Sequence, residues 1–263
     1  FLFSFSAASA FRGASVFAKD AVCVMCGKQH RLDNIYRCTD CQGPLDIRYD
    51  ADVIPQEAFD PGRCSREVGI WVHGDLLPVR KEYAVSLGEG HTPLLPCERL
   101  GNALGLKVLW VKDETRQPTG SFKDRPLCVA VSKAQELRLN TVVTASSGNA
   151  AASMSAYAAR AGLRAVVFVP AQTPAGKLQQ IVALGARVVK IRGTVSDCIS
   201  LTRAAARTFG WYNVTTTFEN PYAVEGDKTV AYEIAAGLNW RTPAWVVVPT
   251  GAGPLPVGIW KGF

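Results

Sequence analysis

The amino-acid sequence predicts an α/β fold in which helices cover both faces of a parallel sheet, with a small cysteine-containing segment in front of it. Three observations predict this fold. From residue 107 onward, short runs rich in Val and Ile alternate with helical runs. Several apolar runs end in loops rich in Gly, Ser, Thr or Asn. Two C-x2-C pairs lie near the start of the chain.

The apolar runs lack the polar alternation of a half-exposed strand, which is typical of strands buried on both faces of a parallel sheet. The helical runs between them would supply the crossover connections that parallel strands need. We find no internal repeat of fixed period. The expected strands are 107–113, 141–145, 164–170, 187–191 and 244–249, and the expected helices are 123–138, 149–161, 174–184, 196–209 and 224–237.

The composition limits the class of protein. Hydrophobic residues make up 48% of the 263 residues and charged residues 19%, which is typical of a globular protein and not of a disordered one. The net charge is +7, but the Lys and Arg residues are scattered instead of clustered, so we expect no nucleic-acid partner. Apolar runs stay shorter than the roughly 18 residues of a membrane helix, so we expect no membrane partner.

The two ends of the sequence suggest a fragment of a longer protein. The chain begins at Phe1 and ends at Phe263, within what reads as the start of a helix. Residues 1–20 are rich in Phe, Ser and Ala and carry no acidic residue before Asp20. A signal or transit peptide, read-through from another frame and a cloning remnant all fit this pattern, so residues 1–20 stay unassigned.

Four cysteines near the start predict a zinc site. Two C-x2-C pairs separated by eleven residues can present four thiolates tetrahedrally to one zinc ion. Segment 21–50 is too short to fold on apolar burial alone, so a metal would stabilise it. Two disulfides or a redox pair are the alternative. The expected ligands are Cys23, Cys26, Cys38 and Cys41, whereas His30 is expected to be a surface residue. The remaining cysteines, Cys64, Cys97, Cys128 and Cys198, read as reduced thiols of a reducing compartment, which favours a cytoplasmic location without excluding an organelle.

Three loops are expected at the carboxyl ends of strands, where parallel sheets bind ligands: 117–123, 145–149 and 249–254. In the first loop, "QPTGSFKDRP" delivers Lys123 from a turn to the first turn of a helix. Burial and the positive potential of a helix N-terminus lower the pKa of a lysine and make it a nucleophile. A surface lysine at a helix start is the alternative.

The other two loops are suited to anions. In "ASSGNAAAS", two hydroxyls, a glycine and the amides that open a helix would hold a carboxylate. "PTGAGP" is a Gly-rich turn that can point its amides at a phosphate. A reactive lysine, a carboxylate site and a phosphate site together suggest pyridoxal phosphate held as a Schiff base.

The same stretches resemble a known family. The chain from about residue 21 to 263 is similar to the threonine synthases, which are fold-type II pyridoxal-phosphate enzymes, and some members carry an N-terminal cysteine ribbon. The motifs that carry the resemblance are "LGEGHTPLLP" (87–96), "KDETRQPTGSFKDR" (112–125), "SSGNAAAS" (146–153), "ENPYAVEGDKT" (219–229) and "PTGAGPLPVGIWKGF" (249–263).

The resemblance implies roles for residues of all three loops. Lys123 would carry the cofactor as a Schiff base and then shuttle protons, and Phe122 would pack near the pyridine ring. Asn149 would donate a hydrogen bond to the phenolic oxygen of the cofactor. The substrate carboxylate would bind at Ser146, Ser147 and Gly148. The cofactor phosphate would bind at Gly251, Ala252 and Gly253.

The resemblance also implies an activity and an organisation. The reaction would convert O-phosphohomoserine and water into threonine and phosphate, and the full-length protein would be a homodimer. Later sequence would supply further strands and the group that faces the pyridine nitrogen. The expected division is a leader at 1–20, a zinc-ribbon-like segment at 21–50, a larger cofactor domain at 51–138 with 215–263, and a smaller α/β domain at 139–214.

The sequence departs from the family pattern at Ala223, where members often have an arginine that is expected to bind the substrate phosphate. Lys228 and Arg164 are candidate substitutes. Two alternatives therefore stay open. One is a sister enzyme, either a cysteate synthase that uses phosphoserine and sulfite or a serine/threonine dehydratase. The other is a zinc-ribbon binding protein without catalysis.

Four other polar residues are expected to have structural roles. His73 and His91 read as structural or surface groups. Glu114 and Asp124 are expected to form local ion pairs or caps and not to act in acid–base catalysis.

Overall fold

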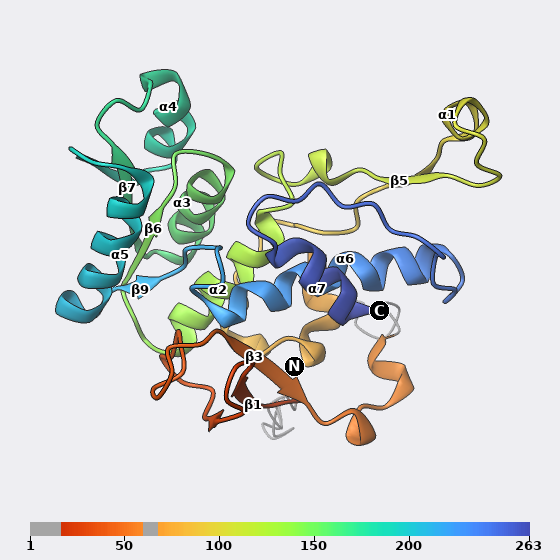
Figure 1. Ribbon diagram of the computed structural model, residues 1–263, viewed down its shortest axis with the longest axis horizontal. Helices are drawn as coiled ribbons and strands as arrows, with labels where there is room; N and C mark the ends of the chain where they lie inside the picture. The colour runs from red at the N-terminus through yellow and green to blue at the C-terminus, as the bar shows by residue number, and fades with distance from the viewer. Residues whose placement is uncertain (1–16, 60–67) are drawn as a thin grey trace, which may run out of the picture.

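The computed structural model of this protein describes residues 17–59 and 68–263. Three separate sheets form in this part of the chain (Figure 1). The strands are β1 (Ala18–Cys23), β2 (Gln29–His30), β3 (Leu45–Tyr49), β4 (Leu94–Pro96), β5 (Trp110–Lys112), β6 (Thr141–Ala145), β7 (Arg164–Pro170), β8 (Arg187–Ile191) and β9 (Tyr212–Asn213). The α-helices are α1 (Glu98–Ala103), α2 (Asp124–Glu136), α3 (Asn149–Ala161), α4 (Ala175–Ala183), α5 (Val195–Phe209), α6 (Pro221–Gly237) and α7 (Pro254–Gly262). Short 3-10 helices are η1 (Ala51–Val53), η2 (Gln56–Phe59), η4 (Gly69–Leu76), η5 (Lys81–Tyr83) and η6 (Glu114–Arg116).

The parallel sheet has four strands in the order β8-β7-β6-β9. Every residue of β6 is buried, as expected of a short run rich in Val without charged residues. Helices α3 and α4 join β6 to β7 and β7 to β8, and α5 returns the chain from β8 to β9 on the other side of β6. The helices therefore cover both faces of the sheet (Figure 1), and the strand order reverses between β6 and β9.

A layer of three packed helices, α2, α6 and α7, lies beside this sheet (Figure 1). Gly226 of α6 allows the close approach to α2, because a Cβ at this position would overlap the backbone oxygen of Arg125. On the other side of α6, Gly258 of α7 lies against Asp227, so the side chain of Asp227 is enclosed between helices. This packing buries the first half of α6 almost completely.

Most elements of the α/β part match the prediction. The strands 141–145, 164–170 and 187–191 form with the expected bounds, and helices occupy all five expected positions. Helix α6 begins at Pro221, three residues before the predicted start. The Asn220 side chain accepts hydrogen bonds from the amides of Tyr222 and Ala223, and proline suits the first helical position.

Two predicted strands are wrong in part or altogether. Of 107–113, only β5 forms, and it pairs antiparallel with β4 outside the parallel sheet. Residues 244–249 form no strand, although their sequence is apolar. Trp245 is 89% exposed and Val247 is 95% exposed, so no described strand pairs with or covers this segment. Loops 117–123 and 249–254 consequently do not follow parallel strands, and only 145–149 does.

The cysteine ribbon, which we define as residues 18–49, contains β1, β2 and β3 paired antiparallel in the order β2-β1-β3. Ala21 and Ile47 of the ribbon belong to the same buried apolar cluster as Leu127 and Val131 of α2. Within the described residues, we see no helix with the length and apolar character to cross a membrane. Residues 1–16 and Cys64 lie outside the described part.

Candidate active site

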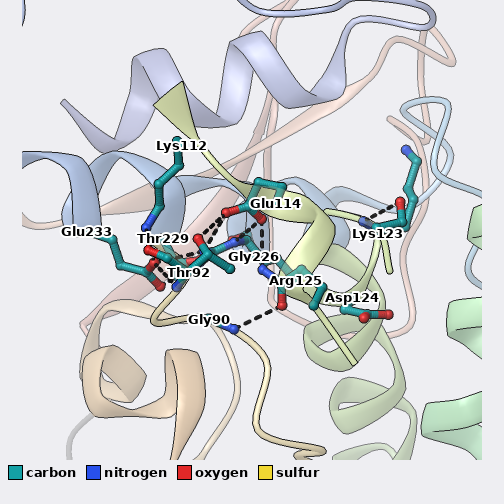
Figure 2. A network of polar contacts seen from close by, with 12 residues as sticks. Gly90, Thr92, Lys112, Glu114, Lys123, Asp124, Arg125, Gly226, Thr229 and Glu233 are labelled. Carbon is teal, nitrogen blue, oxygen red and sulfur yellow. Dashed lines mark hydrogen bonds and ion pairs between the residues drawn. The ribbon is translucent and has the colours of Figure 1, made fainter. Parts of the chain in front are cut away.

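Lys123 stands immediately before α2, at the end of a tight turn. The Asp124 carboxylate accepts hydrogen bonds from the backbone amide and the hydroxyl of Thr119, both at 2.7 Å, and so closes the turn. Figure 2 shows that Lys123 extends away from Arg125, which points into a network of carboxylates on the other side. Local turn chemistry therefore decides that residue 123 is presented away from this network.

The amine of Lys123 is mostly enclosed. Its Nζ donates a hydrogen bond to Thr216 Oγ1 at 3.1 Å and lies 4.6 Å from the centroid of the Phe122 ring. Burial lowers the pKa of Lys123, and the negative charge of Asp227 opposes this shift. A lysine of this kind has a larger neutral fraction near pH 7 than a surface lysine, which is the condition for nucleophilic attack.

The partner of Lys123 lies where the strand order reverses. Thr216 follows β9, and its neighbour Thr215 accepts a hydrogen bond at 3.4 Å from the amide of Ala145, the last residue of β6. Thr215 also lies 3.4 Å, Oγ1 to Oγ1, from Thr144. The site thus lies beyond the carboxyl ends of β6 and β9, at the position where ligands bind in open parallel sheets.

The second loop opens α3. Gly148 precedes the helix, and no side chain in the described part of the chain caps the first amides of α3. Ser146 Oγ accepts a hydrogen bond from the Gly148 amide at 3.2 Å, and both Ser146 and Ser147 are half-buried. Asn149 is exposed at the first helical position. The loop therefore presents amides, hydroxyls and one side-chain amide to a ligand.

The third loop opens α7 and reaches the same region. Gly253 has φ of 96°, a conformation that favours glycine, and a Cβ there would lie 3.4 Å from a ring carbon of Phe218. Gly251 and Ala252 are exposed, and no described side chain caps the first amides of α7. The third loop is thus in contact with the segment that carries Thr216.

Segment 215–218 contacts all three predicted loops, and sequence reasoning missed it. Thr215 contacts the end of β6, Thr216 accepts from Lys123, and Phe218 lies against Gly253. The available signal was the hydroxyl run "TTT" directly after the apolar "YNV". Asp227 was also missed, because within a helix it resembles an exposed polar residue.

Asp227 is a buried acid whose negative charge acts on Lys123. It is 1% exposed, and its Oδ1 has no hydrogen-bond partner in the described part of the chain. Burial raises the pKa of Asp227 to about 7, although the charges of Lys123 and Arg125 oppose the shift and those of Glu114 and Glu225 add to it.

We expect Asp227 to make stability depend on pH. The folded state binds this proton more tightly than the unfolded chain does, so the contribution of Asp227 falls as pH rises from about 3.8 to about 7. Relative to Asp227→Asn, the wild type should lose about 2–3 kcal/mol of unfolding free energy between pH 5 and pH 7.5. Urea unfolding at both pH values would measure this, with the exposed Glu82→Gln as the control. Parallel pH curves for wild type and Asp227→Asn would contradict it.

A buried ion network lies on the other side of the α2 start (Figure 2). Arg125 is fully buried and pairs with Glu114 and Glu233, in each case at 2.7 Å for the shortest contact. Glu233 also accepts from Lys112 and from the amides of residues 91 and 92. Glu114 therefore forms an ion pair and Asp124 closes a turn, as the sequence predicts for both.

Lys228 and Arg164, the two candidate substitutes for the arginine that is missing at Ala223, are both placed elsewhere or engaged in other contacts. Ala223 is buried in the first turn of α6. Lys228 Nζ pairs with Glu225 at 2.7 Å, donates to the carbonyl of Leu76 and lies over the Tyr49 ring. Arg164 is the first residue of β7, so it lies at the amino end of the strand, whereas the site lies beyond the carboxyl ends of β6 and β9. The contacts of Lys228 and the position of Arg164 therefore argue against either residue replacing this arginine.

The two histidines differ from one another. His73 is buried with its ring centroid 5.2 Å from that of Tyr232, and burial lowers its pKa to about 4. His91 is exposed, and its backbone amide donates to Glu233. Both positions agree with structural or surface roles.

The four ribbon cysteines converge on one point. Their Sγ atoms all lie within 4.8 Å of one another, as a tetrahedral metal site requires, and all four are free thiols. The two knuckles have the same backbone design. The amides of Gly27 and Gln42 donate to the carbonyls of Cys23 and Cys38, and both residues have positive φ.

Comparison with known proteins places the chain in a family. The family described as "Pyridoxal-phosphate dependent enzyme" matches residues 85–263. The chain is 40% identical over 243 residues to the threonine synthase of Methanocaldococcus jannaschii, covering 92% of this chain and 60% of that protein. It is 41% identical over 244 residues to the threonine synthase of Methanosarcina acetivorans, covering 92% of this chain and 59% of that protein.

Solved structures agree on the fold. The processed form of threonine deaminase isoform 2 from Solanum lycopersicum superposes with a TM-score of 0.60 at 28% identity, over 65% of this chain and 47% of that one. Diaminopropionate ammonia lyase from Escherichia coli has a TM-score of 0.60 at 22% identity, over 68% of this chain and 59% of that one, and shows the fold alone. The chain spans about 60% of the length of the curated relatives named above. It belongs to the pyridoxal-phosphate dependent enzymes, with the fold-type II architecture.

Proposed function

We propose that the protein binds pyridoxal 5′-phosphate through Lys123 and acts as a threonine synthase, converting O-phosphohomoserine and water into threonine and phosphate. The observation that carries this proposal is the Lys123 amine, which is mostly buried, has a lowered pKa and donates to Thr216 at the strand-order reversal. The relatives named threonine synthase, at about 40% identity, support the choice of reaction.

The residues of the three loops fit this cofactor. A lysine with a lowered pKa suits covalent attachment to an aldehyde. The first amides of α7, around Gly251, Ala252 and Gly253, have no side-chain cap and suit a phosphate. Phe122 already lies beside the Lys123 amine, where a planar ring would be attached. Asn149, at the start of α3, would donate to the phenolic oxygen of the cofactor.

The chain itself binds the substrate and moves its protons. Ser146, Ser147 and the amides near Gly148 would hold the substrate carboxylate at the uncapped start of α3. The amine of Lys123 would take the proton from Cα, help to remove one from Cβ and return one to Cα, because a flexible four-carbon chain reaches neighbouring atoms in turn. The bound cofactor supplies an electron sink for negative charge at Cα.

The ribbon is proposed to hold one structural zinc ion at Cys23, Cys26, Cys38 and Cys41. We expect Cys38→Ser to weaken zinc binding at least about 100-fold, more than the loss of a group outside the ligand shell costs. Metal analysis of purified protein would measure this, with Cys97→Ser as the control because Cys97 lies outside the cluster. One zinc per chain in wild type and in Cys38→Ser alike would contradict the assignment.

The remaining proposals concern organisation. We keep the predicted division into a zinc-ribbon-like segment at 21–50, a larger domain at 51–138 with 215–263 and a smaller domain at 139–214. The parallel sheet and α3, α4 and α5 fall within the last range. We also propose a homodimer for the full-length protein and a cytoplasmic, reducing location, which the free thiols of the described cysteines support.

The test of the reaction follows two products together. The protein would be incubated with pyridoxal phosphate and O-phosphohomoserine, and both inorganic phosphate and threonine would be measured. Equal amounts of both, and neither product with Lys123→Ala, would support the proposal.

Other substrates separate the alternatives. Cysteate from phosphoserine and sulfite, or a 2-oxo acid from serine or threonine, would replace the proposed reaction by a sister activity on the same lysine. A protein that gains no visible absorbance band with the cofactor would refute the cofactor site as well.

A further inference from the structure

The cysteine ribbon is built into the body of the protein and is not a tethered module. It lies beneath α2 and α6 (Figure 1). Tyr49 of β3 donates to Glu225 of α6 at 2.7 Å, and Lys261 of α7 pairs with Asp46 of β3 at 2.6 Å and with Glu225 at 2.7 Å. Helix α7, which follows the third loop, and helix α6, which follows segment 215–218, therefore contact the ribbon directly.

The loop between the two knuckles contacts both ends of the segment that carries Thr216. At one end, the amide of Asn213 donates to the hydroxyl of Tyr36 at 3.0 Å. At the other end, the hydroxyl of Tyr222 donates to the carbonyl of Asp33 at 2.7 Å. The ribbon therefore contacts residues 213 and 222 through these two hydrogen bonds. The residues between them are held by contacts of their own side chains.

The Glu219 side chain is held by two arginines, Arg37 of the ribbon and Arg203 of α5. The Arg37 guanidinium pairs with Glu219 at 2.7 Å, and Arg203 of α5 pairs with the same carboxylate at 2.5 Å. The side chain of Glu219 is only 4% exposed, whereas those of Arg37 and Arg203 are 30% and 42% exposed, so a buried carboxylate is held by charge-assisted contacts from the surface. Glu219 directly precedes the Asn220 cap of α6 and stands three residues after Thr216.

Arg37 is in turn fixed by the second knuckle. It directly precedes Cys38, forms a β-bridge with Pro44, and donates from its other terminal nitrogen to the carbonyl of Gln42 at 3.1 Å. The backbone that wraps the cysteine cluster thus orients the guanidinium that holds Glu219. A disturbance of the knuckle would move Arg37 directly.

We propose that Arg37 is a positioning residue for the lysine site, through which the cysteine ribbon sets the conformation of segment 215–218. The inference rests on the proposed cofactor site at Lys123. Thr216, which accepts from the Lys123 amine, and Phe218, which lies against Gly253, are both held between the Glu219 pair and the end of β9. The ribbon is therefore a structural part of the cofactor site, although it contributes no atom to it.

The test compares Arg37→Ala with Arg31→Ala, because Arg31 is an exposed arginine of the same ribbon. In cofactor-free protein, we expect the amides of 213–220 to exchange hydrogen at least about fivefold faster in Arg37→Ala. Exchange in β8, at the opposite edge of the sheet from β9, should stay unchanged. In cofactor-bound protein, the dissociation constant of pyridoxal phosphate should rise about tenfold. Arg37→Lys should partly reverse both effects, since lysine keeps the positive charge but lacks the planar guanidinium group.

The outcomes separate the two proposals. Wild-type behaviour of Arg37→Ala in both measurements would overturn the role of Arg37, as would faster exchange across the whole chain. A wild type without cofactor on Lys123 would refute the proposed function, and the exchange result would still decide whether Arg37 orders the segment. If Arg37→Ala does not fold, Glu219→Gln keeps the shape of the side chain and should show the same local effects.

Discussion

Replacing Lys123 with alanine is expected to abolish covalent attachment of the cofactor and to lower turnover by about 10³-fold or more. The physical reason is that the described residues place one enclosed amine with a lowered pKa at this site, held by Thr216. Visible absorbance of the protein with pyridoxal phosphate would measure the first effect. Product formation from O-phosphohomoserine would measure the second.

The controls separate the chemistry of the amine from its charge. Lys123→Arg keeps a positive charge but cannot form the covalent bond, so it should lose the absorbance band as alanine does. Lys177→Ala removes an exposed lysine and should behave as wild type. Borohydride reduction and peptide mapping should place the mass of the cofactor on residue 123. A label on another lysine, or a normal band in Lys123→Ala, would show that the assignment of Lys123 is wrong.

The parts of the fold that sequence could predict are those whose cause is local. Strands 141–145, 164–170 and 187–191 are short runs rich in Val and form with the predicted bounds. Segment 244–249 has the same pattern but forms no strand, because a strand also needs a neighbour with which to exchange hydrogen bonds. The apolar pattern of a segment indicates its preference for the strand conformation, but it does not show whether a partner strand is present.

The candidate site shows the same division. The turn at 117–123 and the loop at 145–149 were predicted from their own residues, because Gly, Ser and Asn there have local consequences. Thr216 could not be predicted as the partner of Lys123, since 93 residues separate them and only the tertiary fold brings them together. The burial of Asp227 depends on Gly258 of α7, which lies against it from a later helix.

Loss of the Arg125 ion network is expected to have a large effect on the free energy of unfolding. We expect Arg125→Met to lower the unfolding free energy at pH 7 by about 3–5 kcal/mol, because it leaves two buried carboxylates without their partner. Arg125 is fully buried, and Glu114 and Glu233 are mostly buried. The loss should extend to the loop at 90–92, since Glu233 also accepts from the amides of His91 and Thr92.

The pH dependence of this effect distinguishes the network from simple packing. Burial alone would raise the pKa of Glu233, but the hydrogen bonds and charge of Arg125, with those of Lys112, lower it well below its ordinary value. The stabilisation is therefore present above the unfolded pKa of 4.5 and is lost as pH falls below it. The gap between wild type and Arg125→Met should narrow on acidification, as urea unfolding at pH 7 and at pH 4 would show.

A matched arginine in the same region provides the control. Arg116 is 72% exposed and pairs with Asp113 at 3.3 Å, so Arg116→Met should change stability by no more than about 0.5 kcal/mol. Arg125→Lys should recover little, because an ammonium group cannot form paired hydrogen bonds to two carboxylates at once. Equal effects of Arg125→Met and Arg116→Met would mean that the buried network does not stabilise the fold. A gap that stays constant with pH would assign the loss to packing of the side chain instead of its charge.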